Sequence, residues 1–262
     1  MRVIAIDWSG ARVYAKKKIW LAEVTPRGDL MRLETGRDRD DVARHLVEEA
    51  ARGEQMVVGL DFAFSFPAWF VRERGFDAAW KLWAALAASG EADRWLAACE
   101  PPLWGCNARP KPALAEHFRI TEERAGATAG TRCKSVFQVG GAGAVGTGSI
   151  RGMPVLHRLR EAGFAVWPFT ASASATLVEI YPRLLTGPVN KSREACRHAY
   201  LCEHFPALAP AMRDLASSCE DAFDAAVSAL VMARHTVALR DLAPATDEQT
   251  RIEGDIWRPG AA

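Results

Sequence analysis

Two short apolar segments of this chain each run into an aspartate, and this repetition most constrains the fold. Residues 3–6 are followed by Asp7, and residues 56–60 are followed by Asp61. Both segments are apolar without a polar alternation, which is typical of strands buried on both faces of a sheet. A carboxylate at the end of such a strand either starts a turn or acts as a ligand at the edge of the sheet. One such residue does not decide between these interpretations.

The residues between the two aspartates predict two more strands and a helix. Residues 19–24 and 30–34 are strand-like runs on either side of a turn signal at residues 25–29. Residues 40–52 repeat apolar side chains at helical spacing, and Gly53 follows as a stop signal. The order up to Asp61 is therefore strand, strand, strand, helix, strand.

The rest of the chain predicts an insertion, late strands and more helices. Residues 66–135 are rich in Trp and Ala and contain a proline-rich stretch, which we interpret as a helical insertion over one edge of the sheet. Residues 177–182 have the pattern of a fifth strand, and residues 164–167 are a candidate for a further one. Helices are expected at residues 150–162, 192–204 and 220–239. We expect one α/β domain over residues 1–262, with a mixed five-stranded central sheet flanked by helices.

The composition bounds the class of protein. The chain has 262 residues, of which 49% are hydrophobic and 25% charged, as in ordinary globular proteins. No apolar run reaches the roughly 18 residues of a membrane-spanning helix, and the first residues lack a secretory signal pattern. We therefore expect a cytoplasmic protein with no membrane partner. The six cysteines contain no CxxC pair, and we expect them to be reduced.

A late predicted helix supplies two further aspartates. Asp221 and Asp224 are three residues apart, so their side chains share one face of a helix. Like charges at this spacing repel, and a bound cation would remove that cost. Asp221 has an alternative interpretation, because Ser218 and Asp221 fit a capping box. Asp224 lies among small and apolar residues, so capping does not explain it.

Glu179 is a third acid at the end of an apolar strand. A charge in such a strand needs a reason, because charged side chains are rarely buried without a partner. We interpret Glu179 as a further site carboxylate. The alternatives are pairing with Arg183 and a position on the exposed face of an edge strand.

This order of strands, with acids ending the first and the fourth, resembles the ribonuclease H (RNase H) superfamily, which includes Holliday-junction resolvases, transposases and integrases. Enzymes of this kind hold two divalent metal ions between carboxylates of the central strands and a late helix. The resemblance implies that the metal ligands here are Asp7, Asp61, Asp221 and Asp224. The run Asp221-Ala222-Phe223-Asp224-Ala225 is most similar to the corresponding helix of the resolvase branch.

A set of ordered motifs is similar to a largely uncharacterised bacterial and archaeal domain family, whose members are described as predicted RNase H-like nucleases. The motifs are Ile6-Asp7-Trp8-Ser9-Gly10, Gly59-Leu60-Asp61-Phe62 with Ser65-Phe66-Pro67, Ser135-Val136-Phe137-Gln138-Val139-Gly140-Gly141-Ala142-Gly143, Gly152-Met153-Pro154, Val178-Glu179-Ile180-Tyr181-Pro182-Arg183, Asp221-Ala222-Phe223-Asp224-Ala225 and Glu253-Gly254-Asp255-Ile256-Trp257. Together they extend over nearly the whole chain. They imply the fold directly and nuclease activity only through the fold.

The chemistry that this resemblance implies is phosphodiester hydrolysis with Mg²⁺ or Mn²⁺. One ion activates a water molecule and the other stabilises the leaving oxygen. The expected catalytic residues are Asp7, Asp61, Asp221, Asp224 and Glu179, and the expected partner is DNA or RNA. Candidates for binding a substrate phosphate are Ser9, Arg109, Lys111, Arg132, Lys134 and Arg151.

The charge distribution gives this partner limited support. The net charge is +1, but residues 101–200 carry 13 Lys and Arg against 6 Asp and Glu, which is an excess of 7. Such an excess brings positive potential to a phosphate backbone. It is equally typical of solvated helix faces.

Two other functions remain open. An ATP-dependent small-molecule phosphotransferase of the actin and sugar-kinase type shares the sheet order and also begins with a strand that ends in Asp before a glycine turn. Gly10, however, lies one place later than in the usual Asp-x-Gly, and Asp61-Phe62-Ala63-Phe64 lacks a second glycine loop. A non-catalytic RNase H-like binding protein is the other alternative.

Two further segments have open roles. Residues 141–146 match GxGxxG formally, but they lack the strand–helix–strand unit and the later acid of a dinucleotide site. We interpret residues 140–149 as a structural loop with Ser149 capping the next helix, and phosphate binding is the alternative. Glu253 and Asp255 either fold back onto the site or solvate the tail.

Overall fold

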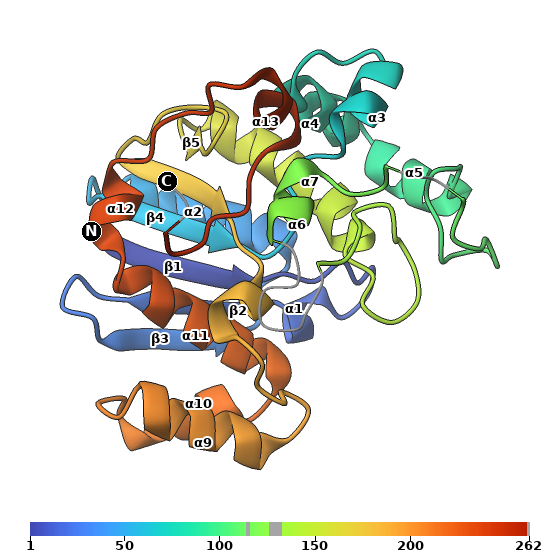
Figure 1. The fold of residues 1–262 in the computed structure, drawn as a ribbon. Helices are drawn as coiled ribbons and strands as arrows, with labels where there is room; N and C mark the ends of the chain where they lie inside the picture. Colours follow the sequence, from blue (N-terminus) through green and yellow to red (C-terminus); the bar gives the residue numbers. More distant parts are fainter. Residues whose placement is uncertain (114–115, 126–132, 261–262) are drawn as a thin grey trace.

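Six strands form a single mixed sheet flanked by helices, so the chain is an α/β protein (Figure 1). The computed structural model describes residues 1–113, 116–125 and 133–260. The strand order is β3-β2-β1-β4-β6-β5. The bounds are β1 Arg2–Asp7, β2 Trp20–Val24, β3 Leu30–Thr35, β4 Met56–Leu60, β5 Ala165–Val166 and β6 Ala175–Glu179. The expectation of five strands was one too few, because the candidate at residues 164–167 pairs with β6 as β5.

The pairing of the strands brings three acid-bearing strand ends to one edge. β1, β2 and β3 are antiparallel neighbours, whereas β1, β4 and β6 run parallel. Ile6 pairs with Leu60, and Leu60 pairs with Glu179. Asp7 and Asp61 each directly follow one of these paired residues. The acids at the ends of the three parallel strands therefore lie side by side at the carboxyl edge of the sheet.

The core is divided by the sheet into two layers. Alternate side chains of β1 enter different layers, since Ile4 and Ile6 pack on one face and Val3 and Ala5 on the other. The first layer is closed by α2, α4 and α7, and the second by α9, α10 and α11. This burial on both faces explains why β1 and β4 are apolar throughout.

The helices follow the expected segments with several changes at their ends. Their bounds are α1 Ala15–Lys18, α2 Arg39–Ala50, α3 Ala68–Glu73, α4 Ala79–Ala87, α5 Glu91–Ala98, α6 Ile120–Ala125, α7 Gly146–Glu161, α8 Pro182–Thr186, α9 Glu194–His204, α10 Pro210–Ser217, α11 Glu220–Ala233, α12 Thr236–Arg240 and α13 Glu248–Glu253. The helix expected at residues 220–239 is divided into α11 and α12. The helices α3 to α6 lie in the segment interpreted as an insertion.

Two local expectations were wrong. Ser149 does not cap α7, because the helix already begins at Gly146; its hydroxyl donates to Val145 O and accepts from Ala63 N–H, both at 3.0 Å. Cys99 and Cys106 form a disulfide, although we expected reduced cysteines. None of the helices in the described part of the chain is long and apolar enough to cross a membrane.

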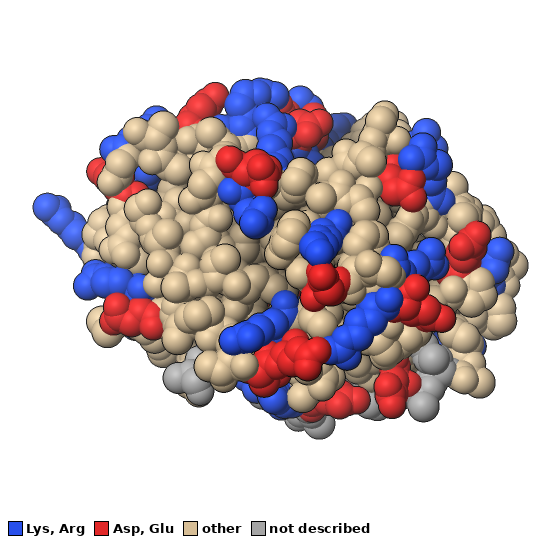
Figure 2. All heavy atoms as spheres, turned by 90° about the horizontal axis from the view of Figure 1, so that it is seen from above, with Lys and Arg blue, Asp and Glu red and all other residues tan. Residues whose placement is uncertain are grey.

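Some of the basic residues within 101–200 are paired with acids from other parts of the chain. Arg151 Nη2 lies 2.8 Å from Asp93 Oδ1, and Arg158 Nη1 lies 3.5 Å from Asp40 Oδ1. Figure 2 shows one face of the molecule on which basic side chains lie interspersed with acidic ones. On this face the excess does not gather into one basic surface.

Candidate functional site: an aspartate cluster beside a pocket

Four aspartates from three separate elements form one electrostatic cluster. Asp7 is the last residue of β1, Asp61 directly follows β4, and Asp221 and Asp224 lie in the first turns of α11. α11 packs across β1, β2 and β3, which carries its aspartates to the sheet. Asp7 and Asp224 are each 8% exposed. The four aspartates that the sequence predicts as metal ligands therefore lie within reach of each other's charges.

Burial and mutual repulsion raise the pKa of these carboxyl groups. The pKa of Asp7 lies well above its ordinary value, first through burial and then through the charges of Asp61, Asp224 and Asp221. The pKa of Asp61 is likewise raised well above its ordinary value by burial, and then by Asp224. Burial also raises the pKa values of Asp221 and Asp224. Carboxylates that share a site in this way disfavour each other's ionisation, which is a frequent property of functional sites.

Lys191 supplies a counter-charge that the sequence interpretation missed. Its ammonium group forms an ion pair with Asp224 Oδ2. The other oxygen, Asp224 Oδ1, is buried and has no hydrogen-bond partner among the described residues. An unsatisfied buried carboxylate oxygen is costly, so this atom is a candidate ligand for a cation. No signal in the sequence singled out Lys191, which lies in the loop after α8.

The carboxylate oxygens of the cluster are suitable ligands for a divalent cation, but the aspartates are not arranged as a closed coordination site. Mg²⁺ and Mn²⁺ prefer oxygen ligands, and the cluster offers four carboxylates and the unpartnered Asp224 Oδ1. Within the described ranges, however, no three or more His, Cys, Asp or Glu side chains are grouped closely enough to hold a metal ion. The four aspartates share one electric field without forming a closed coordination site.

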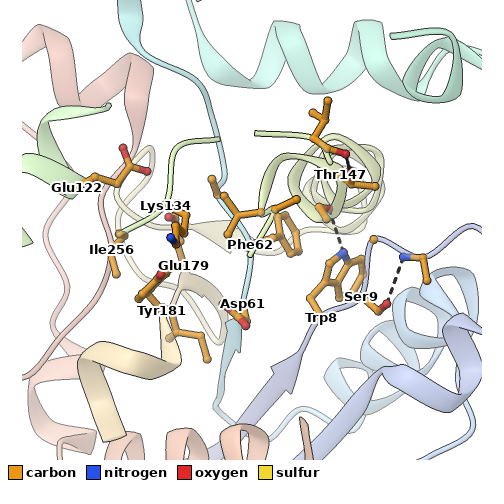
Figure 3. Close-up of a pocket in the computed structure, with 18 of the residues that line it drawn as sticks. Trp8, Ser9, Asp61, Phe62, Glu122, Lys134, Thr147, Glu179, Tyr181 and Ile256 are labelled. Carbon is orange, nitrogen blue, oxygen red and sulfur yellow. Dashed lines mark hydrogen bonds between the residues drawn. The ribbon is translucent and has the colours of Figure 1, made fainter. Parts of the chain in front are cut away.

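A pocket of about 430 Å³ lies beside the cluster at the carboxyl edge of the sheet (Figure 3). Segments far apart in the sequence line it: Trp8 to Ala11, Asp61 to Ala63, Val139 to Gly141, Ala144 to Gly148 without Gly146, and Glu179 to Tyr181, together with Lys18, Arg119, Glu122, Lys134 and Ile256. The loop at residues 140–149, interpreted as structural, therefore forms a wall of the pocket.

The loop after β1 is held tightly against the start of α7. Trp8 Nε1 donates to Gly148 O at 3.2 Å, and a Cβ atom on Gly10 would lie 2.5 Å from Gly148 N. Only glycine at position 10 allows this approach of two backbones. These two contacts explain why Trp8 and Gly10 directly follow Asp7 in the sequence.

Glu179 is held by Arg119. Glu179 Oε2 accepts hydrogen bonds from Arg119 Nη1 and Phe64 N–H, both at 2.8 Å, and Oε1 accepts from Arg119 Nη2. Glu179 is 2% exposed, so the alternative that placed it on an exposed edge was wrong. Its charge raises the pKa of Asp61, which places it in the field of the cluster. Burial raises its own pKa, and the Arg119 guanidinium opposes this.

The same guanidinium ties the tail of the chain to the insertion. Arg119 Nη1 also donates to Glu253 O at 3.0 Å, and Glu253 accepts from Ala68 N–H at 2.8 Å. The Asp255 carboxylate accepts a hydrogen bond from the Thr121 hydroxyl. The tail therefore folds back, and the alternative of a solvated tail was wrong. Both acids bind groups of the insertion, and Ile256 rather than either acid lines the pocket.

Only some of the residues predicted to bind a substrate phosphate line the pocket. Ser9 and Lys134 line the pocket, as does Lys18, which the sequence interpretation missed. Arg151 is taken up by Asp93 and by the carbonyl oxygen of Gly10. Arg109 and Lys111 are not among the residues that line the pocket, and Arg132 lies outside the described residues.

The capping alternative for Asp221 was wrong. The N-cap of α11 is Cys219, whose Sγ accepts from Ala222 N–H at 3.4 Å. The Ser218 hydroxyl instead donates to Leu215 O at 2.7 Å. Asp221 is therefore free of the capping box that the sequence allowed.

Comparisons with protein-family models, with curated proteins and with solved structures found no match to this chain. The resemblance to the family of predicted RNase H-like nucleases thus stays a prediction from the motifs. The function has to be argued from the site itself.

Proposed function

We propose that this chain is a divalent-metal-dependent nuclease with an RNase H-like fold, which hydrolyses nucleic-acid phosphodiesters. The observation that carries the proposal is the cluster of Asp7, Asp61, Asp221 and Asp224 at the edge of the sheet, with raised pKa values. Such a cluster destabilises the protein unless a cation neutralises it, so its presence at one edge of the sheet supports cation binding.

The topology supports the assignment of the fold. Three antiparallel strands are followed by β4 and β6, which extend the sheet in parallel from β1, and a late helix crosses the antiparallel half. Five of the seven motifs behind the family resemblance contribute residues to the pocket, including Trp8, Phe62, Gly141, Tyr181 and Ile256. Motifs spread over the whole chain thus converge on one place, as expected for residues with a shared function.

The residues have distinct roles in this proposal. Bound Mg²⁺ or Mn²⁺ would supply activation of a water molecule and stabilisation of the leaving oxygen. The four aspartates would hold the cations, and Lys18, Lys134 and Ser9, which line the pocket, would contact a substrate phosphate. Glu179 is assigned a positioning role, because Arg119 and Phe64 N–H already engage its carboxylate.

Calorimetric titration of the metal-free protein with Mn²⁺ tests the proposal. Wild type is expected to bind, and Asp7→Asn is expected to lose binding, because a buried anionic ligand is replaced by a neutral amide. Asp77→Asn is the matched control, since Asp77 pairs with Lys81 on the surface outside the cluster. A panel of DNA and RNA substrates, with and without a chelator, then tests cleavage. Equal Mn²⁺ affinity of Asp7→Asn and wild type would contradict the assigned site.

A phosphotransferase is the second candidate, favoured by one observation. The glycine turn after β1 and the glycine-rich loop before α7 both line the pocket, whose volume of about 430 Å³ is sufficient for a nucleotide. This function predicts that ATP binds and that its γ-phosphate is transferred to a small molecule. Formation of ADP and a phosphorylated small molecule, without any cleavage of nucleic acid, would favour it over the nuclease.

A further inference from the structure

The aspartate cluster already contains one cation, the ammonium group of Lys191. The ion pair between Lys191 and Asp224 is largely buried, with side chains that are 18% and 11% exposed. The charge of Lys191 lowers the pKa not only of Asp224 but also of Asp7, Asp61 and Asp221. One ammonium group therefore offsets part of the repulsion in the whole cluster.

We propose, resting on the metal dependence proposed above, that Lys191 and a divalent cation compete for the aspartate cluster, so that the ammonium group must leave Asp224 before a metal ion binds. Two cations that share one carboxylate repel each other strongly in a buried site. In the described part of the structure, the ammonium group of Lys191 occupies Asp224 Oδ2. Asp224 Oδ1 has no hydrogen-bond partner among the residues that the structure describes, so Lys191 satisfies only half of the carboxylate.

Lys191 has an open space to enter when it leaves Asp224. Residues 187–193 connect α8 and α9 beside a pocket of about 410 Å³, which is lined by Lys191 itself and by Asn190, Ser192 and Glu220. Arg197 Nη1 donates to Lys191 O, which fixes the backbone at this point. Because the lysine stem is flexible, the side chain can turn into this pocket, which Glu220 also lines, without movement of the backbone.

The exchange determines how the protein binds metal. In the metal-free protein Lys191 stabilises the folded chain, and in the metal-bound protein it is released to the surface. Removing the ammonium group removes the competitor, so the affinity for metal rises. If Lys191 instead positioned the Asp224 carboxylate for the metal ion and kept this contact in the metal-bound state, removing the ammonium group would lower the affinity for metal.

The experiment has two independent readouts. The first is calorimetric titration with Mn²⁺ at pH 8 of wild type, Lys191→Met and Lys191→Arg, with Lys16→Met as the control. Lys16 forms its ion pairs with Asp38 and Asp41, outside the cluster. We expect about a tenfold lower Kd for Lys191→Met and no change for Lys16→Met. Lys191→Arg keeps the charge and is expected to bind close to wild type.

The second readout uses the wild-type protein alone. Acetylation of lysines, followed by mass spectrometry, is expected to label Lys191 faster after Mn²⁺ is added, because its ammonium group is freed. Lys81, which pairs with Asp77 away from the cluster, reports any general change in reactivity.

The outcomes separate this inference from the proposed function. If wild type binds Mn²⁺, but Lys191→Met binds no more tightly and labelling of Lys191 is unchanged, the exchange is wrong and the metal-dependent function stands. If Lys191→Met binds Mn²⁺ and wild type does not, Lys191 competes so strongly that it prevents metal binding under these conditions. If no variant binds Mn²⁺, both the metal dependence and the exchange fall.

Discussion

At the scale of single residues, the buried aspartates make the stability of the metal-free protein depend on pH. Burial and neighbouring charges raise the pKa of Asp7 well above its ordinary 3.8 in the folded state. A carboxyl group with a raised folded pKa binds its proton more tightly in the folded chain than in the unfolded chain. Its contribution to stability is therefore fully present below pH 3.8 and is lost as the pH rises through the raised value.

Asp7→Asn is expected to stabilise the metal-free protein at neutral pH, because it removes a buried charge from the cluster. A gain of about 1 kcal/mol corresponds to a Tm increase of about 2–4 °C for a chain of this size. The gain should disappear in acidic buffer, where Asp7 is protonated. Thermal unfolding of both proteins in chelator between pH 4 and pH 8 measures it. A uniform loss of stability at every pH would show that Asp7 makes a stabilising contact.

Arg119 illustrates a different use of buried charge. Its guanidinium is enclosed by Glu122 and Glu179, and all three side chains are at most 3% exposed. Removing one partner of such a group leaves the others buried and uncompensated. The salt bridge between Arg158 and Asp40 is exposed and should contribute little.

Arg119→Met is expected to destabilise the protein by about 3–5 kcal/mol, and Arg158→Met by less than about 1 kcal/mol. Adding Glu179→Gln to Arg119→Met should recover part of the lost stability, because it removes one of the buried carboxylates that Arg119→Met leaves without a counter-charge. Urea unfolding of the four proteins, including wild type, gives these free energies. If the double variant is less stable than Arg119→Met, Glu179 has a stabilising role that does not depend on Arg119.

At the scale of elements, the close contact between the loop after β1 and α7 determines the shape of the pocket. A Cβ atom on Gly10 would lie 2.5 Å from Gly148 N and 2.7 Å from Thr147 C. A Cβ atom on Gly148 would meet Trp8 Cδ1 at 3.6 Å, which is an ordinary contact. The two glycines face each other, but only position 10 lacks the space for a Cβ atom.

Gly10→Ala is therefore expected to destabilise the protein by about 1–3 kcal/mol, because backbone atoms must move apart. Gly148→Ala should be neutral or slightly stabilising, since alanine favours a helix over glycine. Thermal unfolding compares the two, and substrate binding should weaken only in Gly10→Ala. Equal effects of both changes would mean that the contact is not constrained as described.

The sequence predicts the elements better than it predicts their contacts. The apolar strands before Asp7 and Asp61 and the spacing of Asp221 and Asp224 were visible, because burial and helical periodicity leave local patterns. The partner of Glu179 was not, because Arg119 lies 60 residues away in the insertion. Lys191 and Lys18 were missed for the same reason, since only tertiary packing brings them to the acids. β5, with two residues, is too short for its pattern to be distinctive.

At the scale of the whole molecule, the cations near the pocket are few. Among the described residues, Lys18, Lys134 and Arg119 line it, and Lys191 lies in the neighbouring aspartate cluster. Arg119 is already paired with Glu122 and Glu179. The face in Figure 2 mixes both signs of charge. These features predict that a nucleic acid is held at a few phosphates around the pocket rather than along an extended basic surface.

The salt dependence of binding tests this prediction. For a single-stranded oligonucleotide and Asp7→Asn, which leaves the strand uncut, we expect log K to fall against log salt with a slope of about −2, corresponding to about three phosphates. Fluorescence anisotropy between 50 and 300 mM salt measures the slope. A slope steeper than about −5 would require a basic surface larger than the pocket provides.

The return of the tail to β6 has a consequence for biosynthesis. Trp257 N–H donates to Glu179 O at 2.8 Å, and Ile256 lines the pocket whose opposite wall begins at Trp8. In a chain emerging from the ribosome, Asp7 and Asp61 leave the exit tunnel long before the residues that build the last wall of the pocket. The pocket of a nascent chain therefore remains incomplete until residue 256 has left the exit tunnel.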